Sequence, residues 1–175
     1  SFRILGHACM LIENDGHRIL IDPWLIGSSY WRSWWHFPKS IEVTPDLFDV
    51  DAIYITHGHF DHFHYPSLRK FKSSVKILIA RFITDRMRAG VESLGFRDIV
   101  EMRHGVPHRL EGGLKLCSYQ HGFDDSAVVV EGSGTTILNL NDSHVTGLAL
   151  RQILKRHPKI DFLLRSHAPA QGYPI

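Results

Sequence analysis

One short segment of this 175-residue chain concentrates side chains that bind metal ions. Residues 57–62 read His-Gly-His-Phe-Asp-His, so imidazoles and a carboxylate alternate with small or apolar residues. An ordinary surface loop is a poor place for such a cluster, because protonated imidazoles repel one another and buried neutral rings need partners for their nitrogens. A divalent metal uses those lone pairs, and nitrogen and oxygen ligands suit zinc, iron and manganese. The segment therefore predicts a metal site that contains His57, His59, Asp61 and His62.

Three further ligand candidates lie far from this segment in the sequence. Each follows a run of apolar or β-branched residues that is typical of a strand, so a sheet would deliver all three side chains to one edge. Taken singly, each has an ordinary alternative as a turn residue, a helix cap or a surface residue. Together the candidates are too many for one zinc or iron ion and suit two ions that share a bridging carboxylate. The expected division places His57, His59 and His121 on one metal and Asp61, His62 and His167 on the other, with Asp142 as the bridge.

The apolar pattern predicts the elements that carry these ligands. Asn14, Asp15 and Gly16 separate two short apolar runs, which indicates a hairpin because these residues tolerate the positive φ of a tight turn. A buried strand over residues 51–56 runs directly into His57. Strands and helices alternate along the rest of the chain, which predicts mixed sheets with helices packed on them, in the α/β or α+β class. The other expected strands cover residues 75–80, 98–102, 114–120, 127–131, 136–140 and 160–164, and the expected helices cover 66–71, 84–93 and 145–156.

Length and composition agree with one globular domain. Hydrophobic residues make up 43% of the chain and charged residues 22%, which is typical of a folded domain and excludes a disordered or fibrous chain. No internal repeat or linker divides the sequence. We therefore expect a single domain over residues 1–175, and we expect that domain to be part of a longer chain.

Charge and cysteine content restrict the partners and the compartment. The formal net charge is only +2 and the basic residues are scattered, so binding to nucleic acid is not expected. No apolar run approaches the roughly 20 residues that a membrane-spanning helix needs, so no membrane association is expected. The 2 cysteines cannot form a disulfide framework, which favours a reducing, cytoplasmic location.

The ligand pattern resembles that of the metallo-β-lactamase-fold superfamily. The match consists of HGHFDH at residues 57–62, followed by the single candidates at 121, 142 and 167, and it extends over nearly the whole chain. The resemblance implies a metallo-β-lactamase-like αββα sandwich, with mixed sheets, helices on the outer faces and a metal site at the edge where strands end. It also places Asp22 below the metals.

Further segments look like the CMP-N-acetylneuraminate hydroxylase branch of that superfamily, which includes iron-dependent monooxygenases. Two departures matter. The animal members carry a Rieske cluster, which needs two cysteines and two histidines in paired motifs, whereas Cys9 and Cys117 stand alone here, so no Rieske cluster is expected in this chain. Those members also lack a histidine at the position of His167. The matching segments are HACM at 7–10, DPWL at 22–25, WW at 34–35, IYI at 53–55, YPSL at 65–68 and GYP at 172–174.

Three polar residues are candidates to support the metals. The resemblance places His7 near them, where it would orient a ligand, touch the substrate, or serve as a hydrogen-bonded structural histidine. Asp22 is expected to support the site without binding metal, since the bridging position is already filled. Asp125 is a candidate to hold a ligating imidazole through its second nitrogen, with a solvated turn as the alternative.

Aromatic residues concentrate between positions 24 and 37. Trp24, Trp34 and Trp35 belong to this group. The group would either wall an apolar pocket that excludes water over the metals, or cover the sheet as ordinary hydrophobic packing.

Two reaction classes fit these predictions. The hydroxylase resemblance favours a non-heme diiron monooxygenase that uses O2 to hydroxylate a C–H bond of a small organic substrate. Its electrons would come from an external donor, because the chain shows no flavin, nicotinamide or iron–sulfur motif. The alternative is a dizinc hydrolase, in which Asp142 and Asp61 orient a bridging hydroxide toward an ester, lactone, amide or phosphodiester. Imidazole and carboxylate ligands bind both metals, so the choice of iron rests on the resemblance. The sequence does not predict the oligomeric state.

Overall fold

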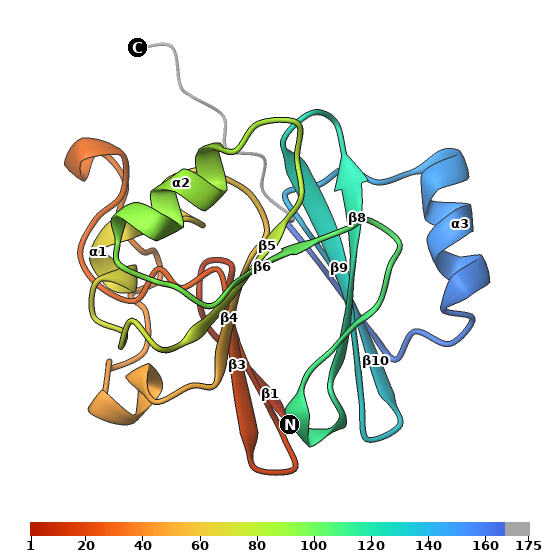
Figure 1. The fold of residues 1–175 in the computed structure, drawn as a ribbon, viewed down its shortest axis with the longest axis horizontal. Helices are drawn as coiled ribbons and strands as arrows, with labels where there is room; N and C mark the ends of the chain where they lie inside the picture. The colour runs from red at the N-terminus through yellow and green to blue at the C-terminus, as the bar shows by residue number, and fades with distance from the viewer. Residues whose placement is uncertain (167–175) are drawn as a thin grey trace.

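The chain folds into two β-sheets that face each other, with helices on their outer sides (Figure 1). The computed structural model describes residues 1–166. Helices α1 (Tyr65–Leu68) and α2 (Arg86–Ser93) lie outside one sheet, and α3 (Gly147–Arg156) lies outside the other. The molecule is a four-layered αββα sandwich, which confirms the predicted fold.

The first sheet is built from the N-terminal part of the chain, and its strands lie side by side in chain order. The first three strands pair antiparallel, and the third to the sixth pair parallel. Parallel strands end at the same edge of a sheet, so the residues that follow the third and fourth strands, Asp22 and Thr56, meet there. The strands are β1 (Phe2–Gly6), β2 (Cys9–Asn14), β3 (His17–Ile21), β4 (Ala52–Ile55), β5 (Lys76–Ala80) and β6 (Ile99–Met102).

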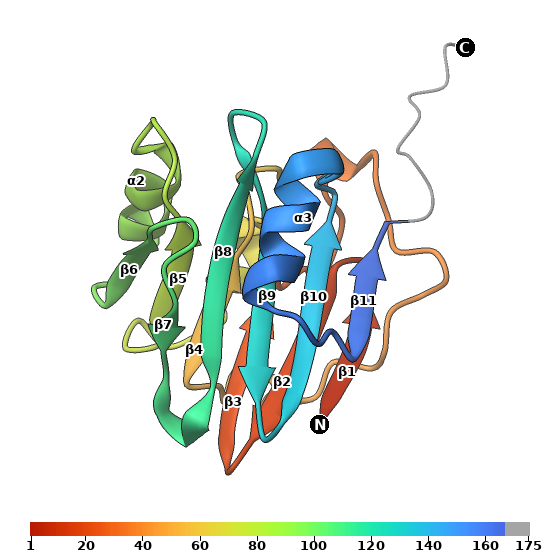
Figure 2. The same cartoon turned by 90° about the vertical axis from the view of Figure 1, so that its right-hand side faces the viewer.

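The second sheet faces the viewer in Figure 2, with α3 in front of it. Its order is β11-β10-β9-β8-β7, with antiparallel pairs except for the parallel pair of β10 and β11. The strands β8, β10 and β11 therefore run in one direction and end at one edge, which carries His121 and Asp142. The strands are β7 (His108–Arg109), β8 (Lys115–His121), β9 (Asp125–Gly132), β10 (Thr135–Asn141) and β11 (Phe162–Arg165).

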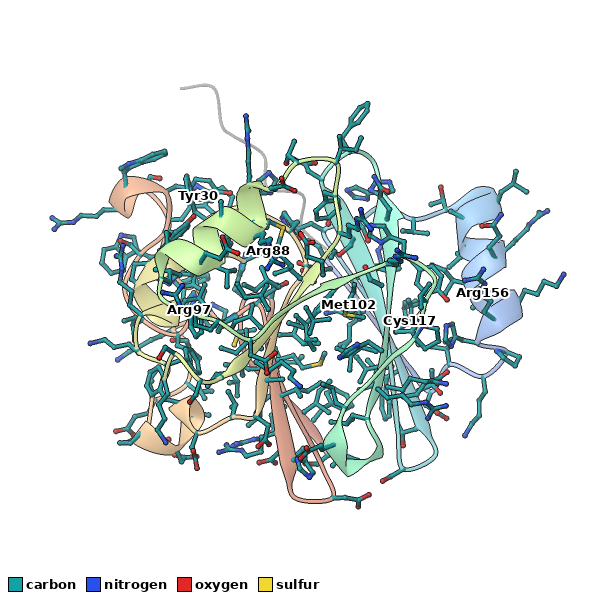
Figure 3. The ribbon with its side chains drawn as sticks, viewed as in Figure 1. Tyr30, Arg88, Arg97, Met102, Cys117 and Arg156 are labelled. Atoms are coloured by element: carbon teal, nitrogen blue, oxygen red, sulfur yellow. The ribbon has the colours of Figure 1, made fainter. Side chains whose placement is uncertain are left out.

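Apolar side chains fill each space between the layers. Met102, labelled near the centre of Figure 3, packs between the two sheets with Val128. Leu68 and Val91 pack α1 and α2 against the first sheet, and Ile153 packs α3 against the second. None of the helices in residues 1–166 is both long enough and apolar enough to cross a membrane. Three short 3-10 helices complete the fold: η1 (Tyr30–Arg32), η2 (Pro45–Phe48) and η3 (Glu111–Gly113).

The structure confirms most of the predicted elements. The hairpin turn contains Asp15 at φ 47° and Gly16 at φ 79°, the positive values that its sequence predicts. The predicted helix at 84–93 begins only at Arg86. The predictions miss β1 and β7, because β1 buries a single side chain, Leu5, and β7 contains only 2 residues.

Gly112 in η3, next to the second sheet, packs closely against the tip of the β2–β3 hairpin. It has a positive φ of 64°, and a Cβ there would lie 2.6 Å from the carbonyl oxygen of Asn14 and 2.5 Å from the ring of His17. Gly112→Ala is therefore expected to combine left-handed strain with a steric clash and to lower the free energy of unfolding by about 2–4 kcal/mol, measured by urea denaturation. Gly113→Ala is the matched control, because its φ is 73° but its Cβ would meet nothing within 4 Å. Equal losses for the two variants would contradict the clash.

Candidate metal centre

His62 lies at the centre of a group of carboxylates and is fully buried. Its Nδ1 is 3.0 Å from Oδ2 of Asp22, and its Nε2 is 3.3 Å from Asp61 and 3.2 Å from Asp142. A proton on Nδ1 donates to Asp22, which leaves the lone pair of Nε2 facing the other two carboxylates. Nε2 is buried and, within residues 1–166, makes no hydrogen bond. An imidazole lone pair that meets two carboxylates is a donor set for a metal cation.

A second imidazole, His57, faces the same point from the end of β4. The hydroxyl of Thr56 donates to Asp22 at 2.7 Å and therefore accepts from Nδ1 of His57 at 3.0 Å. This bond leaves the Nε2 lone pair of His57 to accept from Nδ1 of His59 at 2.9 Å, a hydrogen bond that a bound metal would replace. Burial and the neighbouring His62 lower the pKa of His57 to about 4, so the ring is neutral near neutral pH and able to ligate a metal.

Two sets of potential ligand atoms overlap at His62. The ligand atoms of His57, His62 and Asp142 all lie within 4.8 Å of one another, and so do those of His7, Asp61 and His62. One imidazole nitrogen binds only one ion, so His62 would belong to a single site; its presence in both sets places the two sets side by side, close enough for neighbouring ions. His7, which the sequence placed in a supporting role, is itself part of the second set.

The charges at this point favour a cation. Burial disfavours protonated His62, but its contacts with Asp142, Asp22 and Asp61 outweigh burial and hold the pKa of His62 well above its usual range, so in the metal-free protein a proton occupies the Nε2 position that a metal ion would take. Contact with His62 lowers the pKa of Asp142, and contacts with His62 and His7 outweigh burial and lower that of Asp61. The ionised carboxylates outnumber the imidazolium that they surround, so a divalent cation would neutralise a surplus of negative charge.

Asp22 ties the ends of three strands to this centre. It follows β3, is fully buried and has a positive φ of 45°. Besides the two bonds already described, its carboxylate accepts from the backbone N–H of Thr56 at 2.8 Å and from Nδ2 of Asn141 at the end of β10. The oxygens of Asp22 are thus engaged by protein donors, which fits support of the site without metal binding. Thr56 and Asn141 are not among the predicted site residues, although each directly precedes a predicted ligand, and that position was the available signal.

Asp61 is held by donors on both of its oxygens. Nε2 of His7 lies 2.7 Å from Oδ2, and the hydroxyl of Tyr30 donates to Oδ1 at 2.9 Å. Tyr30, labelled in Figure 3, lies in the η1 turn, far from Asp61 in the sequence. Tyr30 falls within the aromatic segment between positions 24 and 37, and nothing in the local sequence indicates a bond to a metal ligand.

Tyr30→Phe removes one of the hydrogen bonds that orient Asp61. Loss of an outer hydrogen bond to a metal ligand is expected to weaken metal affinity by about tenfold, with the fold unchanged. Titration of the metal-free protein with zinc against a chromophoric chelator measures the affinity, and circular dichroism measures the fold. Tyr65→Phe is the matched control, because the Tyr65 hydroxyl lies beside Gly90 of α2. An affinity of Tyr30→Phe equal to that of the control would show that this bond does not position Asp61.

Two other predicted ligands in the described residues, His59 and His121, belong to neither donor set. His59 is exposed and contacts His57. His121 is half-buried at the end of β8, with its ring centroid 6.4 Å from that of His144. Oδ1 of Asp125 is 3.6 Å from Nδ1 of His57, and burial raises the pKa of Asp125 to about 7. His167 lies outside the described residues.

The three predicted tryptophans line one pocket together with His7. Trp24 is buried, and its ring centroid is 5.2 Å from that of His7. Trp34 and Trp35 are 37% and 65% exposed and line a pocket together with His7 and Trp24. The aromatic group therefore borders the centre through His7.

Sequence comparison places the chain among known proteins. The family model described as a beta-lactamase superfamily domain matches residues 1–167. A protein of Mycolicibacterium smegmatis named as a Rieske 2Fe-2S iron-sulfur protein is 30% identical over 98% of this chain and 35% of its own length. The cytidine monophosphate-N-acetylneuraminic acid hydroxylase of Mus musculus is 32% identical over 79% of this chain and 25% of its own length. The chain thus spans only about a quarter to a third of these curated relatives.

Solved structures share the fold. CmlA, a diiron beta-hydroxylase from Streptomyces venezuelae, superposes with a TM-score of 0.71 at 18% identity, over 91% of this chain and 33% of CmlA. An isothiocyanate hydrolase from Delia radicum gut bacteria gives a TM-score of 0.68 at 21% identity, over 89% of this chain and 66% of the hydrolase. One backbone architecture thus occurs in an oxidative enzyme and in a hydrolytic one.

Proposed function

The chain belongs to the beta-lactamase superfamily, and from that premise we propose that it is a dinuclear metal-dependent enzyme, specifically a non-heme diiron monooxygenase that hydroxylates a C–H bond of a small organic molecule. The observation that carries the metal site is Nε2 of His62, a buried nitrogen that has two carboxylates within 3.3 Å and, within residues 1–166, no hydrogen-bond partner. Such a nitrogen between two carboxylates is costly to bury unless a cation, either a proton or a metal ion, binds to it.

Each metal would have its own set of ligands. The ligand atoms of two imidazoles, His57 and His62, lie within 4.8 Å of the Asp142 carboxylate, which supports the bridging role proposed for it. His7 contacts Asp61 directly, so it is either a further ligand or the donor that fixes Asp61. The proposed ligands are His57, His59 and His121 for one ion, Asp61, His62 and His167 for the other, and Asp142 for both.

Two bound irons would supply the redox chemistry that activates O2, with electrons from an external donor. The residues of this chain would bind the metals, orient the metal ligands and shield the centre. Asp22 fixes the tautomer and orientation of His62, and Tyr30 fixes Asp61. Trp24 is buried and packs edge-on against the ring of His7. We place the enzyme in the cytoplasm on the basis of its two buried, free cysteines.

The preference for hydroxylation over hydrolysis rests on the sequence relatives. The matched hydroxylase of Mus musculus is 32% identical, above the level of the solved structures, and two of the segments that resemble the hydroxylase branch, HACM and DPWL, include His7 and Asp22. Both residues contact proposed metal ligands, so these segments lie where they would affect the chemistry.

The alternative is a dizinc hydrolase, which the same donor set also supports. Imidazole and carboxylate bind zinc as readily as iron. Asp61 and Asp142 flank His62 at 3.3 and 3.2 Å, a placement that would also orient a water molecule for attack on an ester, lactone, amide or phosphodiester.

Metal analysis of the full-length protein decides between the two. The protein is produced in medium that contains both iron and zinc, its metals are quantified, and it is then reduced anaerobically and exposed to O2. About two irons per chain and an optical change that requires O2 are expected. Two zinc ions without iron, together with hydrolysis of a chromogenic ester, would replace the monooxygenase with the hydrolase.

A further inference from the structure

We propose that the pocket between the end of β1 and residues 33–41 binds the planar aromatic part of the substrate. The pocket has a volume of about 610 Å³ and is lined by His7, Trp24, Trp34, Trp35, His36 and Phe37, among others. That volume is in the range of sites for small organic ligands. The inference rests on the proposed function, and it adds the class of substrate: a flat aromatic or heteroaromatic molecule that carries a polar group.

The outer wall of the pocket consists of exposed aromatic rings. Trp35 is 65% exposed and Phe37 is 99% exposed, and both line the pocket beside the half-exposed Trp34. Large aromatic side chains that gather on one exposed face are typical of a binding surface. Flat rings stack on such walls at little cost in conformational entropy, because tryptophan has only two side-chain torsions.

The wall is held in place before any ligand binds. Ser29 and Trp34 exchange two backbone hydrogen bonds of 3.0 and 3.2 Å, and Nε1 of Trp35 donates to the carbonyl oxygen of Arg32 at 3.1 Å. Between these bonds the chain makes a left-handed turn, in which Trp31 has φ 54° and Arg32 has φ 71°. A non-glycine turn of this kind persists only where its surroundings fix it, so the indole rings are preorganised.

The inner wall offers an unpaired polar atom. The His36 ring lies over Trp24, with centroids 4.1 Å apart. Its Nε2 is buried, and within residues 1–166 it has no hydrogen-bond partner. Burial lowers the pKa of His36, so the ring stays neutral near neutral pH. This nitrogen is covered in the ligand-free structure, so a polar substituent of a bound molecule would satisfy it once the His36 ring turns toward the pocket, whereas a purely apolar ligand would leave it unpaired.

His7 connects the pocket to the candidate metal centre. It lines the pocket, its ring packs edge-on against Trp24, and its Nε2 is 2.7 Å from Asp61. A ligand that stacks on Trp35 and reaches His36 therefore lies one side chain away from a proposed metal ligand. This placement suits a substrate whose aromatic part is anchored in the pocket while its reactive part extends toward the centre.

A pair of amides tests the proposal directly in the full-length protein. Benzamide and cyclohexanecarboxamide carry the same polar group on a flat and a puckered ring of similar size. Calorimetric titration is expected to show saturable binding of benzamide, with at least tenfold weaker binding of cyclohexanecarboxamide. Equal affinities, or no saturable binding of benzamide because another part of the protein covers the pocket, would overturn the proposal.

Two tryptophan variants locate the binding surface. Trp35→Ala removes a pocket wall and is expected to weaken benzamide binding by about tenfold or more. Trp31→Ala is the matched control, because Trp31 is 86% exposed in the same segment but is not among the residues that line this pocket. Its affinity should equal that of the unchanged protein, and similar losses in the two variants would overturn the assignment.

Comparison of metal-free and metal-loaded protein separates this proposal from the proposed function. Stacking on Trp35 does not involve the metal, so benzamide binding is expected in both states. If metal analysis finds zinc but the two tests above succeed, the monooxygenase assignment fails and the aromatic pocket stands. If iron is found and benzamide does not bind, the pocket assignment fails alone.

Discussion

Asp142→Ala is expected to lower the metal content of the purified protein from two ions per chain to at most one. Asp142 is the carboxylate that shares a ligand set with His57 and His62, and its side chain is 43% exposed at the edge of the sheet. Loss of a bridge removes a ligand from both ions at once, whereas loss of a terminal ligand affects only one. Inductively coupled plasma mass spectrometry of the dialysed protein measures the content, and activity should fall with it.

Asp124→Ala is the matched control for this change. Asp124 is an exposed acidic residue close to His121, but it belongs to neither donor set. The control should retain the metal content of the unchanged protein. If Asp142→Ala also retained it, Asp142 would not be a bridge, and the division of ligands between two ions would need revision.

Asp22→Ala is expected to destabilise the metal-free protein by about 3–5 kcal/mol, the usual cost of removing one partner from a buried charged network. The change would leave the N–H and hydroxyl of Thr56, the Nδ1 proton of His62 and the amide of Asn141 without their acceptor. Thr56 and Asn141 lie at the ends of separate strands, and His62 lies in the loop that follows one of them, so the loss would loosen the edge that carries the metal ligands. Urea denaturation in the presence of a chelator measures the free energy of unfolding.

Two other aspartate variants make this measurement specific. Asp22→Asn keeps the size of the side chain but presents an N–H to existing donors, so its destabilisation should be smaller than that of Asp22→Ala but clearly measurable. Asp98→Ala disrupts an exposed ion pair with Lys76 at 3.7 Å and should cost less than about 1 kcal/mol. A loss for Asp22→Ala as small as that for Asp98→Ala would contradict the supporting role of Asp22.

The fold was predictable where the local sequence and the tertiary packing favour the same secondary structure. The β2–β3 hairpin follows from Asp15 and Gly16, since few residues accept the backbone angles of its turn. The apolar residues of β4 predict a strand that is covered on both faces, and all of them are buried. By contrast, β1 pairs with β2 while most of its side chains stay accessible, so its apolar pattern carries little signal.

The candidate site was also predictable only in part. The loop that begins at His57 concentrates its donors within a few residues, so their spacing alone predicts a metal site. The bond between Asn141 and Asp22 joins residues 119 positions apart, and the bond between Tyr30 and Asp61 joins residues 31 apart. Asparagine and tyrosine are common at the ends of strands and in aromatic loops, so neither residue type signals such a contact.

The amino-acid sequence by itself determined the order of the elements and the donor atoms available at their ends, because burial periodicity and turn chemistry act over a few residues. Only the tertiary structure decided which nitrogen of His62 faces the candidate metal centre and that His7 contacts Asp61. It also decided that the indole rings line one pocket together with His7. Those facts depend on how two separately formed sheets are aligned across a shared core. That alignment results from the sum of many weak packing contacts and is not encoded in any single motif.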